Sequence, residues 1–332
     1  MLNIFGVENS RLIQLSKPDA PIQTALPAGA VWIDLHSPKR LEEQLVEESL
    51  AIDIPTREEL AEIEVSSRLY QEDDATFMTA TLIRRGIDDD RPESAAVTFI
   101  LKGKQLVTVR YAEPRAFPIF MRRMEKPGQC PVDGENMFIS LLETIVDRSA
   151  DHLEMVGRII DDTSKAVFDR SRGRRQKTKP FDELLIQVGE EGDFTSKMRE
   201  SLVSIGRVVA FYTTLLDQQR QTKAVKESRL RLKTLQRDIQ SLTDHSSFLS
   251  AKISFLLDAV LGMISIEQNG IIKIFSVAAV VFLPPTLVAS IYGMNFQFMP
   301  ELAWGWGYPF ALVLMVVSAV VPYLYFRAKG WL

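Results

Sequence analysis

Two long stretches without a charged residue lie close together near the C-terminus of the chain. The first runs from Ile274 to Ile291 and the second from Tyr308 to Phe326. At about 1.5 Å of rise per residue, a helix of either stretch is about 27 Å long, close to the ~30 Å core of a bilayer. One such stretch could be the buried helix of a soluble protein. Two of them, flanked by aromatic residues and joined by a short loop, predict a transmembrane hairpin.

The charges that flank the hairpin predict its orientation. Lys273 precedes the first stretch, Arg327 and Lys329 follow the second, and the loop between them contains Glu301 but no Lys or Arg. By the positive-inside rule, both termini are cytoplasmic and the loop faces outward. The N-terminus lacks the basic and apolar regions of a secretory signal, which agrees with this orientation. The single cysteine, Cys130, excludes an intramolecular disulfide.

The part of the chain before the hairpin is charged and acidic, and its first 135 residues mix two patterns. Alternating β-branched and aromatic residues predict strands, and proline-opened segments rich in Glu and Leu predict helices between them. The expected strands are 30–35, 76–83, 95–101 and 105–111, and the expected helices are 38–50 and 55–63. This interleaving predicts an α/β domain with a mixed sheet over residues 1–135.

Helical patterning replaces the strand pattern after residue 135. Residues 136–225 are expected to form a helical hairpin, whose basic stretch 170–179 is interpreted as a solvated tip rather than as a lipid or nucleic-acid patch. One continuous helix then leads into the membrane. This helix is expected to comprise a stalk, 226–270, and a pore-lining first span, 271–292. A periplasmic loop, 293–307, a second span, 308–327, and a cytoplasmic tail, 328–332, are expected to follow it.

One face of the stalk and first span carries small and polar residues at alternating intervals of four and three. These seam residues are Asp258, Gly262, Ser265, Asn269, Ile272, Ser276, Ala279, Leu283 and Thr286. Their mean spacing is close to the coiled-coil period of 3.5. Two spans cannot enclose a water-filled path, so transport would need several copies around one axis. The seam favours a lumen narrowed by Ile272 and Leu283, although small-residue helix packing gives a similar pattern.

The end of the first span carries a recognisable motif. Gly293-Met294-Asn295 follows the charge-free stretch and precedes MPEL (299–302) and WGYP (306–309). These segments resemble the signature of the CorA family of magnesium and divalent-cation channels. IEQNGIIKIFSV (266–277), VWIDL (31–35) and ELAEIEVSSRLYQEDD (59–74) are also similar to the enterobacterial branch of that family.

The resemblance implies an overall architecture and an activity. It implies a homopentamer in the bacterial inner membrane, with an α/β cytoplasmic domain, an all-α membrane part and a long stalk helix that continues into the pore-lining span of a two-helix hairpin. The implied activity is influx of Mg²⁺, and also of Co²⁺ and Ni²⁺, driven by the membrane potential and gated by cytoplasmic Mg²⁺. Mg²⁺ is then both cargo and regulatory ligand, and no nucleic acid takes part.

The resemblance also implies roles for single residues. Gly293, Met294 and Asn295 correspond to the selectivity filter at the outer mouth, and Gly293 is expected to leave the helix in a conformation that alanine resists. The pore-lining and gating residues are Thr286 as a polar ring, Leu283 as a hydrophobic gate, Ala279, Ser276, Ile272, and Asn269 as a polar ring at the inner mouth. The candidate regulatory metal ligands are Asp258, Asp73 and Asp74, because Thr234 stands where parts of the family carry an acidic residue.

Three other functions stay open at this point. A zinc- or cobalt-selective transporter would share the fold, although the GMN sequence argues against zinc as the main cargo. A non-conducting, membrane-anchored scaffold would leave the polar seam and Asn295 without a use. An enzyme is disfavoured because the sequence has no phosphate loop, HExxH motif or nucleophile elbow, and His36, His152 and His245 lie far apart.

Overall fold

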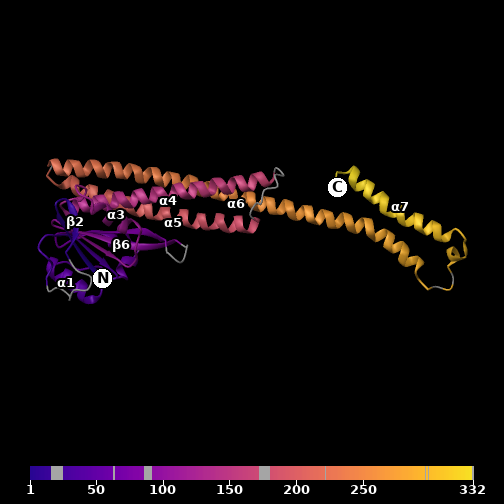
Figure 1. Cartoon of the computed structure of the whole chain (residues 1–332), viewed down its shortest axis with the longest axis horizontal. Coiled ribbons are helices and arrows are strands. Elements are labelled where there is room, and N and C mark those ends of the chain that lie inside the picture. Colours follow the sequence, from indigo (N-terminus) through magenta and orange to yellow (C-terminus); the bar gives the residue numbers. More distant parts are fainter. Residues whose placement is uncertain are drawn as a thin grey trace. The chain divides into compact units, whose positions relative to one another are not determined.

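The computed structural model describes residues 1–15, 25–62, 64–85, 92–171, 180–220, 222–295, 297 and 299–330. The chain divides into two compact units, Met1–Leu257 and Asp258–Leu332. Figure 1 shows the sheet and helices of the first unit and the apolar helices of the second.

A seven-stranded sheet forms the centre of the first unit, in the order β2-β1-β3-β7-β6-β5-β4. The strands are β1 (Leu2–Glu8), β2 (Arg11–Gln14), β3 (Ala30–His36), β4 (Leu69–Glu72), β5 (Ala75–Arg85), β6 (Pro92–Lys102) and β7 (Gln105–Arg110). Only β3 and β7 pair in parallel, whereas every other neighbouring pair is antiparallel. The mixed sheet expected from the sequence is therefore confirmed, with β1, β2 and β4 as strands that the sequence pattern missed.

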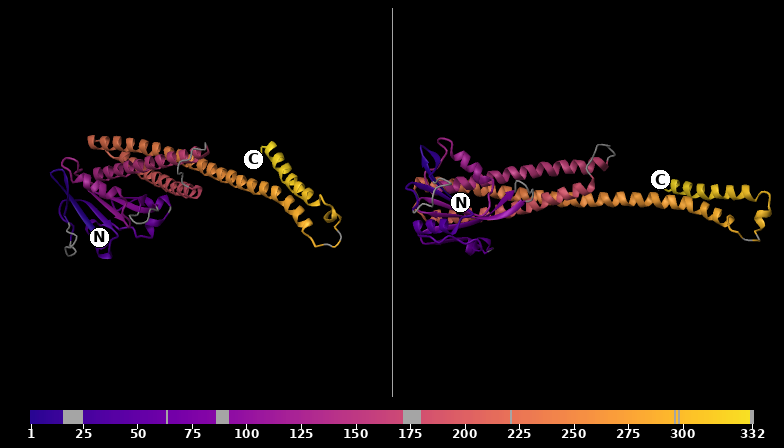
Figure 2. Two further views of the ribbon diagram at one scale, coloured as in Figure 1. Left: turned by 45° about the vertical axis from the view of Figure 1, so that its right-hand side comes forward. Right: turned by 60° about the horizontal axis from the view of Figure 1, so that its bottom comes forward.

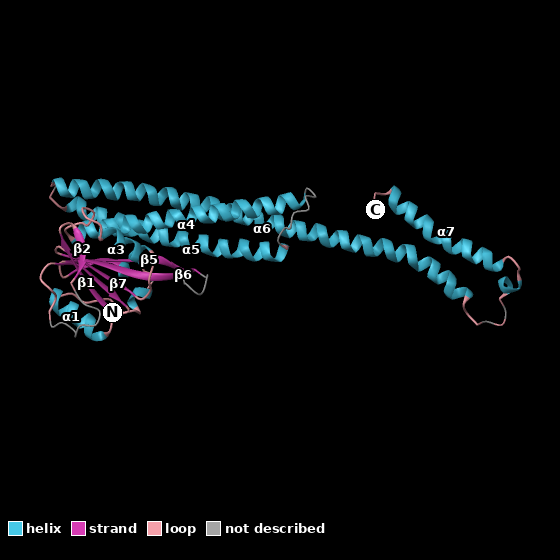
Figure 3. Cartoon of the chain, viewed as in Figure 1, coloured by secondary structure: helices cyan, strands magenta, loops and turns pink. Residues whose placement is uncertain are grey.

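Two hydrophobic cores cover the two faces of the sheet. One face packs against α3 (Ala116–Met124), α4 (Gly134–Ser171) and α5 (Phe181–Gln218), and Figure 3 shows these helices layered on it. The other face packs against α1 (Arg40–Leu50) and the loops around it. From Trp32 onwards the residues of β3 alternate between the two faces, with Trp32 in the first core and Ile33 and Leu35 in the second. This alternation follows from the two-residue period of a strand.

The helix expected over 55–63 is wrong. Only a short 3-10 turn, η1 (Glu59–Ala61), forms there, and the single-turn α2 (Val65–Arg68) follows it. The Glu59 carboxylate accepts hydrogen bonds from the Thr56 backbone N–H at 2.7 Å and from the Thr56 hydroxyl at 2.9 Å. Glu62 then adopts extended backbone angles, φ −61° and ψ 143°. The hydrogen bonds between Thr56 and the Glu59 side chain close one turn. The extended backbone at Glu62 then prevents the helix from continuing.

The long helix α6 (Lys223–Tyr292) is continuous, as expected. Within the first unit its buried residues complete the helical layer on α4 and α5: Leu232, Leu235, Ile239, Leu249, Ile253 and Leu256. The expected basic tip, 170–179, lies almost entirely outside the described residues.

The second unit contains the distal part of α6, the 3-10 turn η2 (Pro300–Ala303) and α7 (Gly307–Ala328). Figure 2 shows α7 returning antiparallel to α6. Both helices are long and apolar enough to cross a membrane. The Lys273 ammonium donates a hydrogen bond to the Gly330 carbonyl at 3.3 Å, which joins the start of the first apolar stretch to the end of the second.

Candidate functional site

The distal end of α6 presents the GMN motif. The Gly293 N–H donates to the Ala289 carbonyl at 2.9 Å, and the Met294 N–H donates to the Ile291 carbonyl at 3.3 Å. Asn295 follows and is exposed. Among the described residues, no hydrogen bond engages the Asn295 amide. Its carbonyl oxygen is therefore available to water or to a hydrated ion.

Glycine at position 293 is favoured by lack of space for a Cβ atom and not by a left-handed backbone conformation. Among the described residues, the glycines with positive φ are Gly29, Gly103, Gly128 and Gly330, and Gly293 is not one of them. Its constraint is space, because a Cβ atom there would lie 3.0 Å from the Ala289 carbonyl oxygen. That approach is tight, so the helix end must shift by a few tenths of an ångström to accept alanine.

All nine seam residues are exposed on the single chain. The two bulky apolar members, Ile272 and Leu283, expose 62% and 65% of their surface. By contrast, Val277 is buried and Val281 and Val288 are half-buried on another side of α6. At about 100° per residue, these valines lie far around the helix from the seam. The seam thus faces away from the side of α6 that is already covered.

Thr286 is oriented by its own helix. Its hydroxyl donates to the Phe282 carbonyl at 2.7 Å. A hydroxyl has one proton and two lone pairs, so this bond leaves only acceptor capacity on the exposed oxygen. Pro284 and Pro285 lie inside the same turn and supply no N–H to the helix ladder. The turn is consequently rich in oxygen acceptors and poor in donors, which suits a cation or the water around it.

The candidate regulatory residues have separate local settings. Asp73 and Asp74 form the two-residue turn between β4 and β5, with φ of 48° and 56°. Two consecutive positive φ values are typical of a type I′ hairpin turn, which Asp tolerates better than most residues. The Lys102 ammonium donates to the Asp73 carbonyl. Asp258 is exposed at the start of the second unit.

The described part of one chain contains no group of three or more His, Cys, Asp or Glu side chains placed to hold a metal. Asp73 and Asp74 in the first unit, and Asp258 in the second, therefore belong to no such group within their own described unit. Thr234 uses its hydroxyl within α6, where it donates to the Leu230 carbonyl at 3.2 Å.

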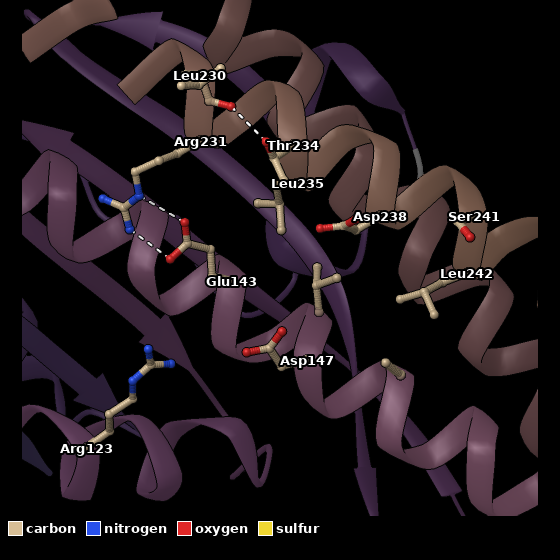
Figure 4. Close-up of a pocket in the computed structure, with 12 residues that line it drawn as sticks. Arg123, Glu143, Asp147, Leu230, Arg231, Thr234, Leu235, Asp238, Ser241 and Leu242 are labelled. Atoms are coloured by element: carbon tan, nitrogen blue, oxygen red, sulfur yellow. Dashed lines mark hydrogen bonds and ion pairs between the residues drawn. The ribbon is translucent and has the colours of Figure 1, made fainter. Parts of the chain in front are cut away.

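A polar groove that no sequence pattern predicted lies between α4 and α6, beside α3. Figure 4 shows Asp147 and Asp238 projecting into it. Glu143 is held at one end by a bidentate ion pair with Arg231, at 2.9 and 2.8 Å. Burial raises the pKa of Asp147, and the neighbouring carboxylates of Glu143 and Asp238 raise it further. The four-residue spacing of Glu143 and Asp147 predicts that both lie on one face of a helix. The groove itself depends on α6 packing beside that face, which the sequence does not indicate.

Comparison with known proteins gives a consistent result. The family model described as "CorA-like Mg2+ transporter protein" matches residues 27–328. The magnesium transport protein CorA of Pectobacterium atrosepticum is 36% identical, and that of Escherichia coli K12 is 37% identical, each over 100% of both chains.

Solved structures show the same fold at lower identity. The CorA magnesium transporter of Methanocaldococcus jannaschii superimposes with a TM-score of 0.74 at 18% identity, over 100% of this chain and 99% of the other. The full-length CmaX protein superimposes with a TM-score of 0.64 at 13% identity, over 99% and 98% of the two chains.

Proposed function

The chain belongs to the CorA family, and from that premise we propose that it carries Mg²⁺ across a membrane through a pore built by several copies of itself. The observation that carries the proposal is the seam on α6, exposed on one chain and turned away from the covered valine side. Two spans cannot enclose a water-filled path, so the seam becomes a lumen only when neighbouring copies contribute theirs. A homopentamer in the bacterial inner membrane, with both termini cytoplasmic, is the arrangement that the family resemblance and the flanking charges favour.

Asn295 selects the ion at the outer mouth. Mg²⁺ gives up its hydration water reluctantly, so proteins commonly hold it through that water. A ring of Asn295 amide oxygens accepts hydrogen bonds from the hydrated ion without a full negative charge. Because binding must remain weak enough for release, a neutral ring suits conduction better than a ring of carboxylates. Gly293 and Met294 shape the end of the helix that presents this ring.

Thr286 lies nearer the cytoplasmic end of the first span than Asn295 does, and it extends the polar path there. Its donor is engaged by the Phe282 carbonyl, so a ring of Thr286 side chains offers only oxygen lone pairs to the ion's water. Ser276, Ala279 and Asn269 line the remaining lumen. Leu283 and Ile272 close it when the helices approach, because an apolar constriction excludes water and raises the barrier to a charged ion. The membrane potential, negative inside, drives entry with about 4.6 kcal/mol per 100 mV for two charges.

Cytoplasmic Mg²⁺ closes the pore by bridging carboxylates of neighbouring copies. Asp258, Asp73 and Asp74 are the candidates. The described residues of one chain hold no three-residue metal group, which supports a ligand set that combines residues of different copies. Loss of internal Mg²⁺ then releases the copies from one another and opens the path. Co²⁺ and Ni²⁺ share the charge and the oxygen-rich hydration shell, and they use the same route.

The proposal is tested with purified full-length protein in liposomes that contain a Mg²⁺-sensitive dye. With an inside-negative potential imposed, the wild-type chain should take up Mg²⁺, and Asn295→Ala should lose most of that uptake. Gln297→Ala removes another amide of the same loop and should leave uptake unchanged. Equal uptake by Asn295→Ala and wild type would remove the selectivity role of the amide. No uptake of any ion by wild type would favour the scaffold, and preference for Zn²⁺ over Mg²⁺ would favour the zinc-selective alternative.

A further inference from the structure

Two phenylalanine side chains stand exposed on the first-unit part of α6. Phe248 and Phe255 expose 60% and 59% of their surface. Leu249 and Leu256, each the next residue along the helix, are buried against the helical layer. Leaving an aromatic side chain in water forgoes about 1.5–3 kcal/mol of burial. The side of α6 that packs within the chain is thus already satisfied, and the two rings lie on a different side.

Neighbouring rings within the chain cover them only in part. The Phe255 ring stacks on that of Phe168 in α4, with centroids 6.2 Å apart and planes at 25°. The Phe248 ring lies 6.1 Å from the ring of His245, one turn away on the same helix. More than half of each phenylalanine surface remains open after these contacts. The contacts orient the two rings without burying them.

Phe248 and Phe255 continue the seven-residue repeat of the seam towards the N-terminus of α6. Phe248 and Phe255 are one heptad apart, and successive heptads along α6 reach Gly262, then Asn269, Ser276 and Leu283. α6 has no break over this interval. A strict seven-residue repeat stays on one face only when helices wind around a common axis, because a straight helix drifts by about 20° per heptad. The two phenylalanines therefore occupy the heptad position that Leu283 occupies in the apolar span.

We propose that Phe248 and Phe255 meet the same residues of neighbouring copies around the oligomer axis and close two apolar rings in the ion path. This inference rests on the proposed function, because only an assembly around an axis brings the rings together. The occupant of the exposed surface is a second copy of this chain. Hydrated Mg²⁺ does not cross a closed aromatic ring, so these rings act as a constriction separate from Leu283 and Ile272. Asp258, three residues after Phe255 in the sequence, then places a carboxylate next to the Phe255 ring.

Cysteine cross-linking tests the placement. The chain has one cysteine, Cys130, which is buried, and Cys130→Ser provides a background without reactive thiols. In that background, Phe255→Cys or Phe248→Cys in the full-length protein should give subunit dimers with a short bismaleimide. Ser276→Cys, within the proposed pore, is the positive control. Ile186→Cys is the negative control, because Ile186 is an apolar residue of α5 that is equally exposed, at 62%.

The outcomes separate this inference from the proposed function. Cross-linking at Ser276→Cys without cross-linking at Phe248→Cys or Phe255→Cys would overturn the aromatic rings and leave the proposed pore intact. A monomeric chain that cross-links at no position would remove both. Dimer formation by Ile186→Cys as strong as that by Phe255→Cys would also overturn the inference, because the linkage would then reflect random collision.

Ion flux tests the role of the rings. With only micromolar Mg²⁺ on the proposed cytoplasmic side, where the gates at Leu283 and Ile272 are open, the double variant Phe248→Ser/Phe255→Ser should raise Mg²⁺ flux at least about threefold, since a polar ring no longer excludes water. Ile186→Ser should leave the flux at the wild-type value. Both phenylalanines are exposed on the single chain, so the double variant should keep the wild-type fold, which circular dichroism checks. An unchanged or lower flux in the folded double variant would contradict the proposal.

Discussion

Arg110 and Asp34 form a bidentate ion pair across the parallel strands β7 and β3. The Nε–Oδ1 and Nη2–Oδ2 distances are both 2.9 Å, and the two side chains expose 2% and 0% of their surface. Thr108 donates to Asp34 Oδ1 at 2.8 Å, and Arg110 Nη1 donates to the Ala112 carbonyl at 3.0 Å. These bonds compensate for the loss of hydration that burying two charges entails. The network thereby joins the side chains of the two strands that pair in parallel at the centre of the sheet.

Asp34→Asn should lower the free energy of unfolding by about 3–5 kcal/mol, because it leaves the buried Arg110 charge without its counterion. Urea unfolding of the purified full-length protein, followed by circular dichroism, measures this loss. Glu93→Gln is the matched control. Glu93 pairs with Arg84 at 3.8 Å on the surface, and its loss should cost no more than about 1 kcal/mol. Similar small costs for both variants would contradict a structural role for the buried pair.

Asp147→Asn should stabilise the protein at neutral pH. Burial, with the charges of Glu143, Asp151 and Asp238, raises the pKa of Asp147 in the fold. A raised pKa means that the folded state binds the proton more tightly than the unfolded state does. The ionised carboxylate therefore destabilises the fold at pH 7, and this penalty is lost as the pH falls through the folded pKa.

The gain from Asp147→Asn should accordingly shrink towards zero below about pH 4, near the unfolded pKa of an aspartate. Unfolding temperatures of the two proteins between pH 4 and pH 7 test this dependence. Glu154→Gln removes an exposed carboxylate of the same helix, and it should leave the unfolding temperature unchanged at both pH 4 and pH 7. A stability gain that does not change with pH would refute the electrostatic explanation.

Thr286→Val should reduce Mg²⁺ uptake, because a methyl group replaces the only side-chain oxygen in that turn. Loss of one hydrogen bond of about 1 kcal/mol to the hydrated ion corresponds to a roughly fivefold lower rate. Thr286→Ser keeps the hydroxyl and should retain most of the uptake. Liposome flux under an imposed potential provides the measurement. Equal rates for the valine and serine variants would show that the hydroxyl does not contact the ion's water.

Leu283→Asn should allow Mg²⁺ to leak when internal Mg²⁺ is high. An amide side chain keeps water at this constriction, which shortens the dewetted part of the closed path and lowers the barrier to the ion. Leu283→Ile conserves volume and apolar character, and it should close as the wild type does. Flux is compared at micromolar and at tens-of-millimolar internal Mg²⁺. If the asparagine variant closes as tightly as the isoleucine variant, Leu283 is not a gate.

Asp258→Asn should raise the internal Mg²⁺ concentration needed to close the pore, because it removes one of the candidate bridging carboxylates. Glu267→Gln, an exposed acidic residue of α6 outside the seam, should leave that concentration unchanged. The dose dependence of flux on internal Mg²⁺ distinguishes the two variants. Wild-type flux that is insensitive to internal Mg²⁺ would contradict regulation by this ion.

Part of the fold could be predicted from the sequence because it depends on residues that lie close together along the chain. The apolar spans, the continuity of α6 and the period of its seam are all local patterns, each contained within a single helix, and the structure confirms the uninterrupted helix. The expected helix over 55–63 failed for a local reason as well, since the bonds from Thr56 to the Glu59 side chain closed a single turn. Propensity alone did not reveal that competing interaction.

The sequence by itself determined where the apolar helices lie, which face of α6 carries the seam, and where the GMN motif follows it, because length and periodicity act over a few turns. Only the tertiary structure decided that Asp34 pairs with Arg110, that β1, β2 and β4 extend the sheet, and that α4 and α6 form a polar groove. These features join residues far apart in the chain. Which of many distant partners a side chain meets depends on how the whole core packs, and no local pattern contains that information.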